Sequence, residues 1–105
     1  MFIGKIKGNV VATRKLETVV GQKLAVVEPY GMRGDDAPTL SPTGRALVTI
    51  DPLGAGEGQF VLVTQGSSAR LTEMTKKMPI DAVVIGIIDS ITVNDGEVYH
   101  DKAGA

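Results

Sequence analysis

The sequence contains no cysteine and no tryptophan, and its only aromatic residues are two Phe and two Tyr. Without cysteine there is no disulfide framework, no thiolate metal site and no thiol nucleophile. Proteins that bind single-stranded nucleic acid stack bases on aromatic side chains, and this chain offers few of them. Its 11 Lys and Arg residues are balanced by 12 Asp and Glu residues, so the basic excess typical of phosphate-binding proteins is also missing.

Long apolar stretches are absent as well. The longest, residues 82–88, is far shorter than the ~20 residues that a membrane-spanning helix needs. The N-terminus shows no charged-then-apolar signal pattern. We therefore expect an unexported chain that binds no membrane. A length of 105 residues fits one domain, which we place at residues 1–100, followed by a disordered tail over 101–105.

Most of the sequence alternates between apolar and polar residues, as β-strands do. We expect strands over residues 2–13, 22–28, 46–51, 59–65 and 82–93, with a short return strand over 97–100. Asn94, Asp95 and Gly96 form a hairpin turn signal before that return strand. The continuous apolar run from Phe60 to Val63 indicates a strand that is buried on both faces.

Two segments depart from the strand pattern. Residues 30–45 are rich in Gly, Pro and Asp, which predicts an exposed loop. Residues 67–77 are the one plausible helix, with a serine cap at its start and Pro79 after its end. Short strands, abundant glycine and this helix together predict an all-β fold: a small OB-like five-stranded barrel with one short helix and a C-terminal hairpin strand.

The glycine-rich segment Gly54, Ala55, Gly56, Glu57 and Gly58 invites comparison with phosphate-binding loops. Its third glycine comes one residue too early for the dinucleotide fingerprint, and a strand follows it instead of a helix. A tight turn with positive φ angles is the simplest interpretation. A sharper alternative is a turn that packs against copies of itself around a symmetry axis, where side chains would collide.

The segment Ser67, Ser68, Ala69 and Arg70 raises the possibility of a nucleophilic serine. The elbow motif G-x-S-x-G fails at its last position, and His100 is the only histidine that could act as a base. A small hydrolase that uses Ser68 is therefore the least favoured function, and a helix cap is the simpler role for these serines.

Three carboxylates, Asp51, Asp81 and Asp89, interrupt apolar strands or follow their ends. Their spacing matches no metal-binding loop, so we expect them to form ion pairs or to accept hydrogen bonds from backbone amides. We predict no catalytic residue, no metal site and no cofactor.

Five segments, in their order along the chain, resemble the vertex proteins of bacterial microcompartments, the family found in carboxysomes and in ethanolamine- and propanediol-using compartments. They are residues 3–15, 21–27, 51–62, 66–70 and 79–89. Each motif alone is weak, but the ordered set is specific and covers nearly the whole chain. One departure is the segment 30–45, which looks longer than the usual loop there.

The resemblance implies a non-enzymatic shell protein in the bacterial cytoplasm. It implies a homopentamer that caps the vertices of a polyhedral shell, among hexameric and trimeric shell proteins, with a narrow pore on the fivefold axis. Gly54–Gly58 would lie near that axis, and Ser67, Ser68, Ala69, Arg70 and Asp81 near the subunit contacts. The alternative function, suggested by the OB-like barrel, is a single-stranded nucleic-acid-binding protein.

Overall fold

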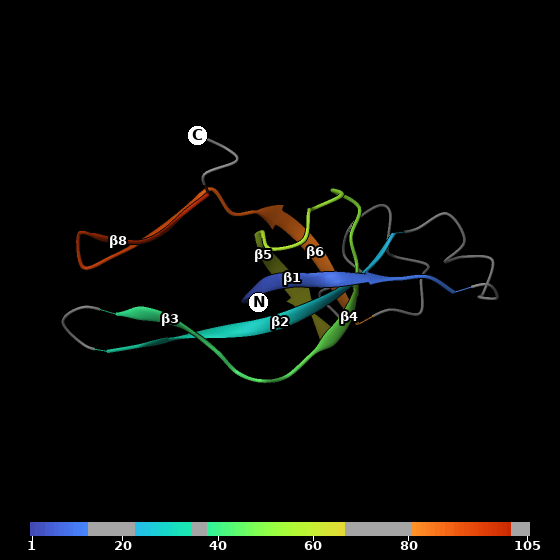
Figure 1. Ribbon diagram of the computed structural model, residues 1–105, viewed down its shortest axis with the longest axis horizontal. Helices are drawn as coiled ribbons and strands as arrows, with labels where there is room; N and C mark the ends of the chain where they lie inside the picture. Colours follow the sequence, from blue (N-terminus) through green and yellow to red (C-terminus); the bar gives the residue numbers. More distant parts are fainter. Residues whose placement is uncertain (13–22, 35–37, 67–80, 102–105) are drawn as a thin grey trace.

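The computed structural model describes residues 1–12, 23–34, 38–66 and 81–101. These residues form eight strands (Figure 1): β1 (Phe2–Val10), β2 (Leu24–Arg33), β3 (Thr39–Pro42), β4 (Leu47–Ile50), β5 (Phe60–Gln65), β6 (Ala82–Ile87), β7 (Ser90–Val93) and β8 (Gly96–His100). The helix expected at residues 67–77 lies outside the described residues.

Five strands close into a barrel. The large sheet has the order β1-β5-β6-β4-β2-β3, and β1 also pairs with β2, which closes β1, β5, β6, β4 and β2 into a ring. Strand β3 is an extension that pairs with the far half of β2. Only the β4–β6 pair is parallel; the other pairs of the barrel are antiparallel. The expected small all-β five-stranded barrel is therefore confirmed.

The barrel interior is filled by aliphatic side chains from alternate strand positions. Ile6, Val27, Val61, Val63 and Val84 are each no more than 3% exposed and belong to one cluster. Burial of such side chains is the main force that stabilises a domain of this size.

The described residues of the segment 30–45 are mostly exposed, as expected, but they form a pair of strands rather than a loop. Strand β2 continues past Pro29 to Arg33, and β3 pairs back along it, with Tyr30 opposite Pro42. Proline is tolerated at position 29 because the pairing with β4 ends at Val27 and the pairing with β3 begins at Tyr30. No ladder bond on that side needs the missing N–H group.

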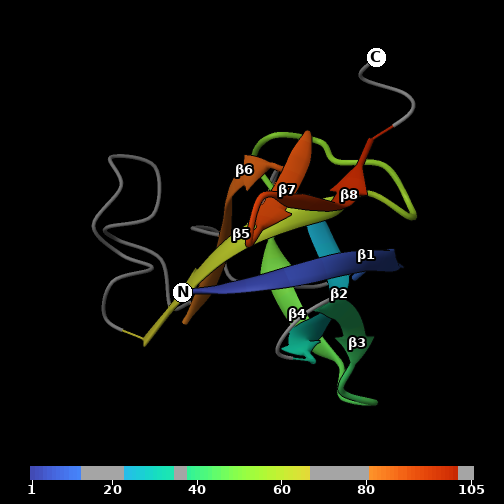
Figure 2. The same ribbon diagram turned by 90° about the vertical axis from the view of Figure 1, so that its left-hand side faces the viewer.

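The predicted strand over residues 82–93 is also two strands rather than one. Strand β6 ends at Ile87, and β7 begins at Ser90 in a separate two-stranded sheet with β8. Asn94 and Asp95, between β7 and β8, have φ angles of 52° and 63°, which confirms the hairpin turn that their sequence predicts. We call the β7–β8 hairpin, residues 90–100, the C-terminal arm. Figures 1 and 2 show that it projects from the same end of the barrel as the β2–β3 hairpin.

An aromatic cluster holds the root of the C-terminal arm against the barrel. The ring of Phe60 on β5 makes edge contacts with Tyr30 and Tyr99, at centroid distances of 4.9 and 4.6 Å. Phe60 is only 7% exposed, and Val61 and Val63 on the other side of β5 are fully buried. The expected burial of this strand on both faces is therefore confirmed.

Asp101, which the sequence assigned to the disordered tail, is instead part of the fold. It is 8% exposed, and its backbone N–H donates to the carbonyl oxygen of Asp89 over 2.7 Å. The tail predicted from residue 101 therefore starts too early, and residues 102–105 lie outside the described part of the chain.

Candidate functional site

The loop between β4 and β5 is organised around one buried carboxylate. Asp51 is 1% exposed and follows directly after β4. Its Oδ1 accepts hydrogen bonds from the backbone N–H groups of Leu53 and Gly54, over 3.2 and 3.0 Å. Its Oδ2 accepts a third from Ala55 over 2.8 Å. A buried carboxylate is stable only when it is satisfied in this way, so Asp51 fixes the path of the loop. The expected role of this residue, accepting hydrogen bonds from backbone amides, is confirmed.

Two glycines in this loop have backbone conformations that favour glycine. The φ angles are +70° at Gly54 and +89° at Gly58, which confirms the interpretation as a tight turn. Ala55 between them is buried in the barrel core. The far end of the loop is tied to β1, because Gly58 N–H donates to the carbonyl of Ile6 over 2.8 Å. The loop is therefore anchored at its start, middle and end, while Gly54, Gly56, Glu57 and Gly58 are exposed.

A small pocket lies beside this loop. It has a volume of about 150 Å³, and Lys23, Asn9 and Glu57 contribute polar groups to its lining. Lys23 is in part engaged already, because its Nζ donates to the carbonyl of Ala55 over 3.5 Å. Sites for nucleotides and other cofactors usually measure about 300 to 1,000 Å³. The pocket is too small for such a ligand.

The second group of expected site residues is only partly visible. Asp81 is exposed just before β6, and its carbonyl accepts a hydrogen bond from Gly66 N–H over 2.7 Å. Ser67, Ser68, Ala69 and Arg70 lie outside the described residues.

The described residues contain no clustered set of metal-ligating side chains. Within them, no group of three or more His, Asp or Glu side chains is arranged to hold a metal ion. The Nδ1 atom of His100 lies 3.6 Å from a carboxylate oxygen of Glu97, and both side chains are about half exposed. In this same part of the chain, no helix is long and apolar enough to cross a membrane.

The aromatic side chains are used for packing rather than displayed as a stacking surface. Phe60 is enclosed by Tyr30 and Tyr99, and Lys5 Nζ lies 5.7 Å from its ring centroid. Burial is the main cause that raises the pKa of Tyr99 above its ordinary value of 10.0, followed by the negative charge of Asp101. Three of the four aromatic rings thus pack in one cluster with Phe60 at its centre. This arrangement does not favour the nucleic-acid-binding alternative, which needs rings displayed for base stacking.

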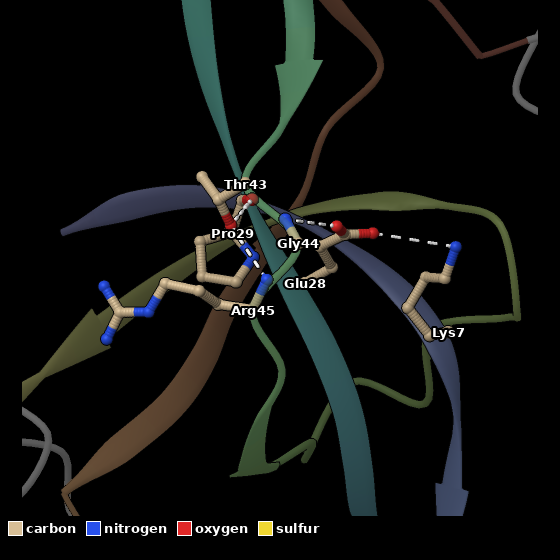
Figure 3. A network of polar contacts seen from close by, with 6 residues as sticks. All are labelled: Lys7, Glu28, Pro29, Thr43, Gly44 and Arg45. Carbon is tan, nitrogen blue, oxygen red and sulfur yellow. Dashed lines mark hydrogen bonds and ion pairs between the residues drawn. The ribbon is translucent and has the colours of Figure 1, made fainter.

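A polar network that sequence reasoning missed holds the connection between β3 and β4 (Figure 3). Glu28 accepts a hydrogen bond from Gly44 N–H over 2.9 Å and lies 3.7 Å from Lys7 Nζ. Thr43 donates from both its N–H and its Oγ1 to the carbonyl of Pro29, over 3.2 and 2.8 Å. The network holds the β3–β4 connection against β2, at the point where β2 stops pairing with β4 and begins to pair with β3. A glutamate before a proline carries no sequence signal for such a role.

Comparison with known proteins identifies a family. The family model described as "Ethanolamine utilisation protein EutN/carboxysome" matches residues 1–89. The carboxysome shell vertex protein CcmL of Gloeobacter violaceus is 36% identical over 102 residues, which cover 97% of this chain and 96% of that protein. The microcompartment shell vertex protein GrpN of Rhodospirillum rubrum is 42% identical over 95 residues, which cover 90% of this chain and 100% of GrpN.

Solved structures give the same result. A structure described as carboxysome subunit CcmL has a TM-score of 0.85 at 36% identity, and covers 97% of this chain and 100% of its own. A structure of GrpN, described as a pentameric microcompartment shell protein, has a TM-score of 0.71 at 40% identity, and covers 89% of this chain and 100% of its own. The resemblance seen in the sequence is confirmed. The chain belongs to the EutN/CcmL family, whose members named here are shell vertex proteins of carboxysomes and other bacterial microcompartments.

Proposed function

We propose that this chain is a structural subunit of a bacterial microcompartment shell and forms homopentamers that occupy the shell vertices. The observation that carries the proposal is the 42% identity to GrpN over the whole of that protein, together with the description of GrpN as a pentameric shell protein. The barrel and its topology match the same structures. We propose no catalytic activity, in keeping with the structural role that the names of these relatives give.

The physical logic of a vertex subunit follows from symmetry. Tiles with sixfold packing form flat layers, and a closed polyhedron needs points of fivefold symmetry. A pentamer is a cyclic assembly in which one head-to-tail contact repeats until the ring closes. Each subunit therefore needs two different surfaces that fit one another. Hexameric and trimeric shell proteins in the bacterial cytoplasm are the proposed neighbours of the ring.

We place the exposed glycines of the Asp51 loop beside the fivefold axis. Gly54, Gly56 and Gly58 lack side chains, so five copies of the loop can approach closely around a narrow pore. The three hydrogen bonds to Asp51 keep each loop in one conformation. A ring of such loops would be rigid and of constant width. Ser67, Ser68, Ala69, Arg70 and Asp81 remain the proposed contributors to the subunit contacts.

Native mass spectrometry of the full chain tests the oligomeric state. We expect a pentamer at micromolar concentration, and a strictly monomeric or dimeric species would contradict the proposal. Co-expression with a hexameric shell protein tests the vertex role: closed polyhedral particles are expected with the chain, and open sheets or tubes without it.

The axial placement of the loop has its own test. Gly56 is exposed, and an added Cβ would meet only the side chain of Gln59, at 3.5 Å. The substitution Gly56→Trp should therefore leave the barrel folded and reduce the yield of pentamer. An unchanged pentamer yield would overturn the axial placement without affecting the vertex proposal.

A further inference from the structure

The C-terminal arm meets the rest of the described fold at its root and along β3. Its two strands pair with each other in a separate sheet and make no ladder with the barrel strands. Contact between the Tyr99 and Phe60 rings and the bond from Asp101 N–H to Asp89 hold its root. Beyond that root the arm is a single two-stranded hairpin, and such hairpins are marginally stable in water on their own.

The arm has one apolar face and one polar face. Ile91 is opposite Tyr99 in the register, and Val93 lies two positions further along the same strand, so these three residues share a face. All three are half-buried, whereas Thr92 between the two aliphatic residues and Glu97 opposite Thr92 are exposed. Val93 is the aliphatic residue next to the turn, furthest from the aromatic root.

The apolar face is not closed against the barrel of its own chain. A groove of about 410 Å³ lies between Ile91 on the arm and the barrel residues Ile3 and Leu62. Ile87 and Ile88 add to its apolar lining. An open apolar groove beside a weakly supported hairpin marks a surface where a partner is bound.

The C-terminal arm itself carries two exposed acids, Asp95 and Glu97, and no Lys or Arg. The described residues 81–101 contain no Lys or Arg and carry five acids: Asp81, Asp89, Asp95, Glu97 and Asp101. The described residues 1–12 and 23–34 carry four basic residues against one acid: Lys5, Lys7, Lys23 and Arg33 against Glu28. Acids on one surface of a chain favour contact with a surface of a second copy that presents a basic side chain.

A surface that complements the arm lies on the outside of β2 and β4. Val26 and Val48 are register partners there, on the side opposite to the buried Val27, and Val48 is 55% exposed. Arg45 is exposed just before β4, and Figure 3 shows its guanidinium extending away from the polar network. We call Val26, Val48 and Arg45 the β4 surface. In Figure 1, β4 lies towards the end of the molecule opposite to the arm.

We infer that the C-terminal arm of one copy docks its Ile91–Val93 face on the β4 surface of a second copy of this chain. The inference rests on the proposed pentamer and names two surfaces that form its repeating contact. The two surfaces differ, as the head-to-tail contact of a closed ring requires, and Asp95 and Glu97 of the arm would face Arg45 of the next copy. The neighbour would also cover the groove at the root of the arm.

A pair of neighbouring substitutions tests the role of the apolar face. Val93→Asp places a carboxylate in the proposed contact, whereas Thr92→Asp adds the same charge to the exposed face of the same strand. Native mass spectrometry should show the pentamer fraction of Val93→Asp lowered by about tenfold or more, with Thr92→Asp close to wild type. Circular dichroism should report a folded barrel in both. A Val93→Asp variant that stays pentameric would overturn the inference.

Chemical cross-linking tests the contact directly, because the wild-type chain contains no cysteine. In a Val93→Cys/Val48→Cys variant, a short bismaleimide should join neighbouring copies into a ladder that ends at a covalent pentamer. Each single variant should show no ladder, since a head-to-tail ring does not bring two copies of one surface together. A Val93→Cys/Met32→Cys variant is the control, because Met32 is exposed on the β2–β3 hairpin.

The outcomes separate the two proposals. A wild-type chain that is not pentameric overturns the proposed function, and the docking of the arm with it. A pentameric wild type with no Val93–Val48 ladder overturns the docking of the arm alone. A cross-link from Val93→Cys to an added hexameric shell protein, with no Val93–Val48 ladder, would assign the arm to that tile instead and would equally overturn the inference.

Discussion

Gln59 donates a hydrogen bond from its Nε2 to Oδ2 of Asp101 over 3.1 Å, although the two residues are 42 positions apart. The Oε1 atom of the same side chain accepts a hydrogen bond from Gly56 N–H over 2.7 Å. One side chain therefore joins the exposed turn of the glycine loop to the end of the C-terminal arm.

The substitution Gln59→Glu should break this link. The new carboxylate cannot donate to Asp101 and places a second negative charge beside it, so we expect the free energy of unfolding at pH 7 to fall by about 1 to 3 kcal/mol. The repulsion between two carboxylates is largest where both are charged, so the loss is full at neutral pH and shrinks in acid. Urea unfolding at neutral and acidic pH measures both effects.

The matched control for this prediction is Gln65→Glu, the same chemical change at an exposed position on β5. We expect it to alter the unfolding free energy by no more than about 0.5 kcal/mol. Equal effects of the two variants at pH 7 would show that the Gln59–Asp101 link contributes nothing.

The parts of the fold that sequence reasoning predicts well are those where local pattern and tertiary burial agree. The apolar run from Phe60 to Val63 indicates a strand buried on both faces, and Tyr30 and Tyr99 do cover its outer side. The turn at Asn94 and Asp95 is predicted correctly because positive φ angles at two successive residues need a particular local sequence. The barrel follows from such strands and from the order of the family motifs.

The parts that were missed depend on partners distant in sequence. Composition predicts a loop at residues 30–45, but Tyr30 pairs with Pro42 and Arg33 with Thr39 once β2 has passed the end of its pairing with β4. Asp101 looks like part of a polar tail until Gln59, far away in the sequence, is placed beside it. Neither contact leaves a local pattern that a single sequence reveals.

Asp51 gives a second prediction, about the glycine loop. In Asp51→Asn, one carboxylate oxygen is replaced by an NH₂ group that cannot accept, so at least one of the three loop amides loses its partner. We expect a loss of about 1.5 to 3 kcal/mol in the free energy of unfolding, because the lost bonds are to a charged acceptor. Hydrogen exchange should also become faster at Gly54 and Ala55.

Glu57→Gln is the control for Asp51→Asn, because Glu57 is an exposed carboxylate in the same loop. Its stability and its amide exchange should stay close to wild type. Unchanged exchange at Gly54 and Ala55 in Asp51→Asn would mean that the loop keeps its path without this carboxylate.

Gly4 gives a third prediction, about barrel closure. It is buried on β1 between β2 and β5, and a Cβ atom there would overlap the Cγ1 atom of Val27, which is itself fully buried. Gly4→Ala should therefore lower the free energy of unfolding by about 1 to 3 kcal/mol through overpacking. At Gly8 on the same strand, no atom of the described residues lies within 4 Å of an added Cβ. Gly8→Ala should leave stability unchanged or slightly raised, and equal losses at both sites would refute the overlap as the cause.

Tyr99 gives the last prediction, about the response of the arm root to high pH. Its phenol has a pKa raised above the ordinary value of 10.0, first because of burial and next because Asp101 lies nearby. The unfolded chain releases this proton at about pH 10, while the folded chain retains it, so the unfolded state binds fewer protons above that pH. The stability that neutral Tyr99 contributes is thus complete below pH 10 and is lost as pH rises beyond it.

The ionisation of Tyr99 can be followed alone in a Tyr30→Phe variant, because the chain has two tyrosines. The ultraviolet absorbance of tyrosinate should appear at a higher pH in the folded protein than in the same protein unfolded by urea. Asp101→Asn removes the nearby charge and should bring the two titrations closer together, while leaving the larger effect of burial. Coincident titrations of the folded and unfolded Tyr30→Phe variant would show that Tyr99 is open to water and that the aromatic root of the arm is not closed.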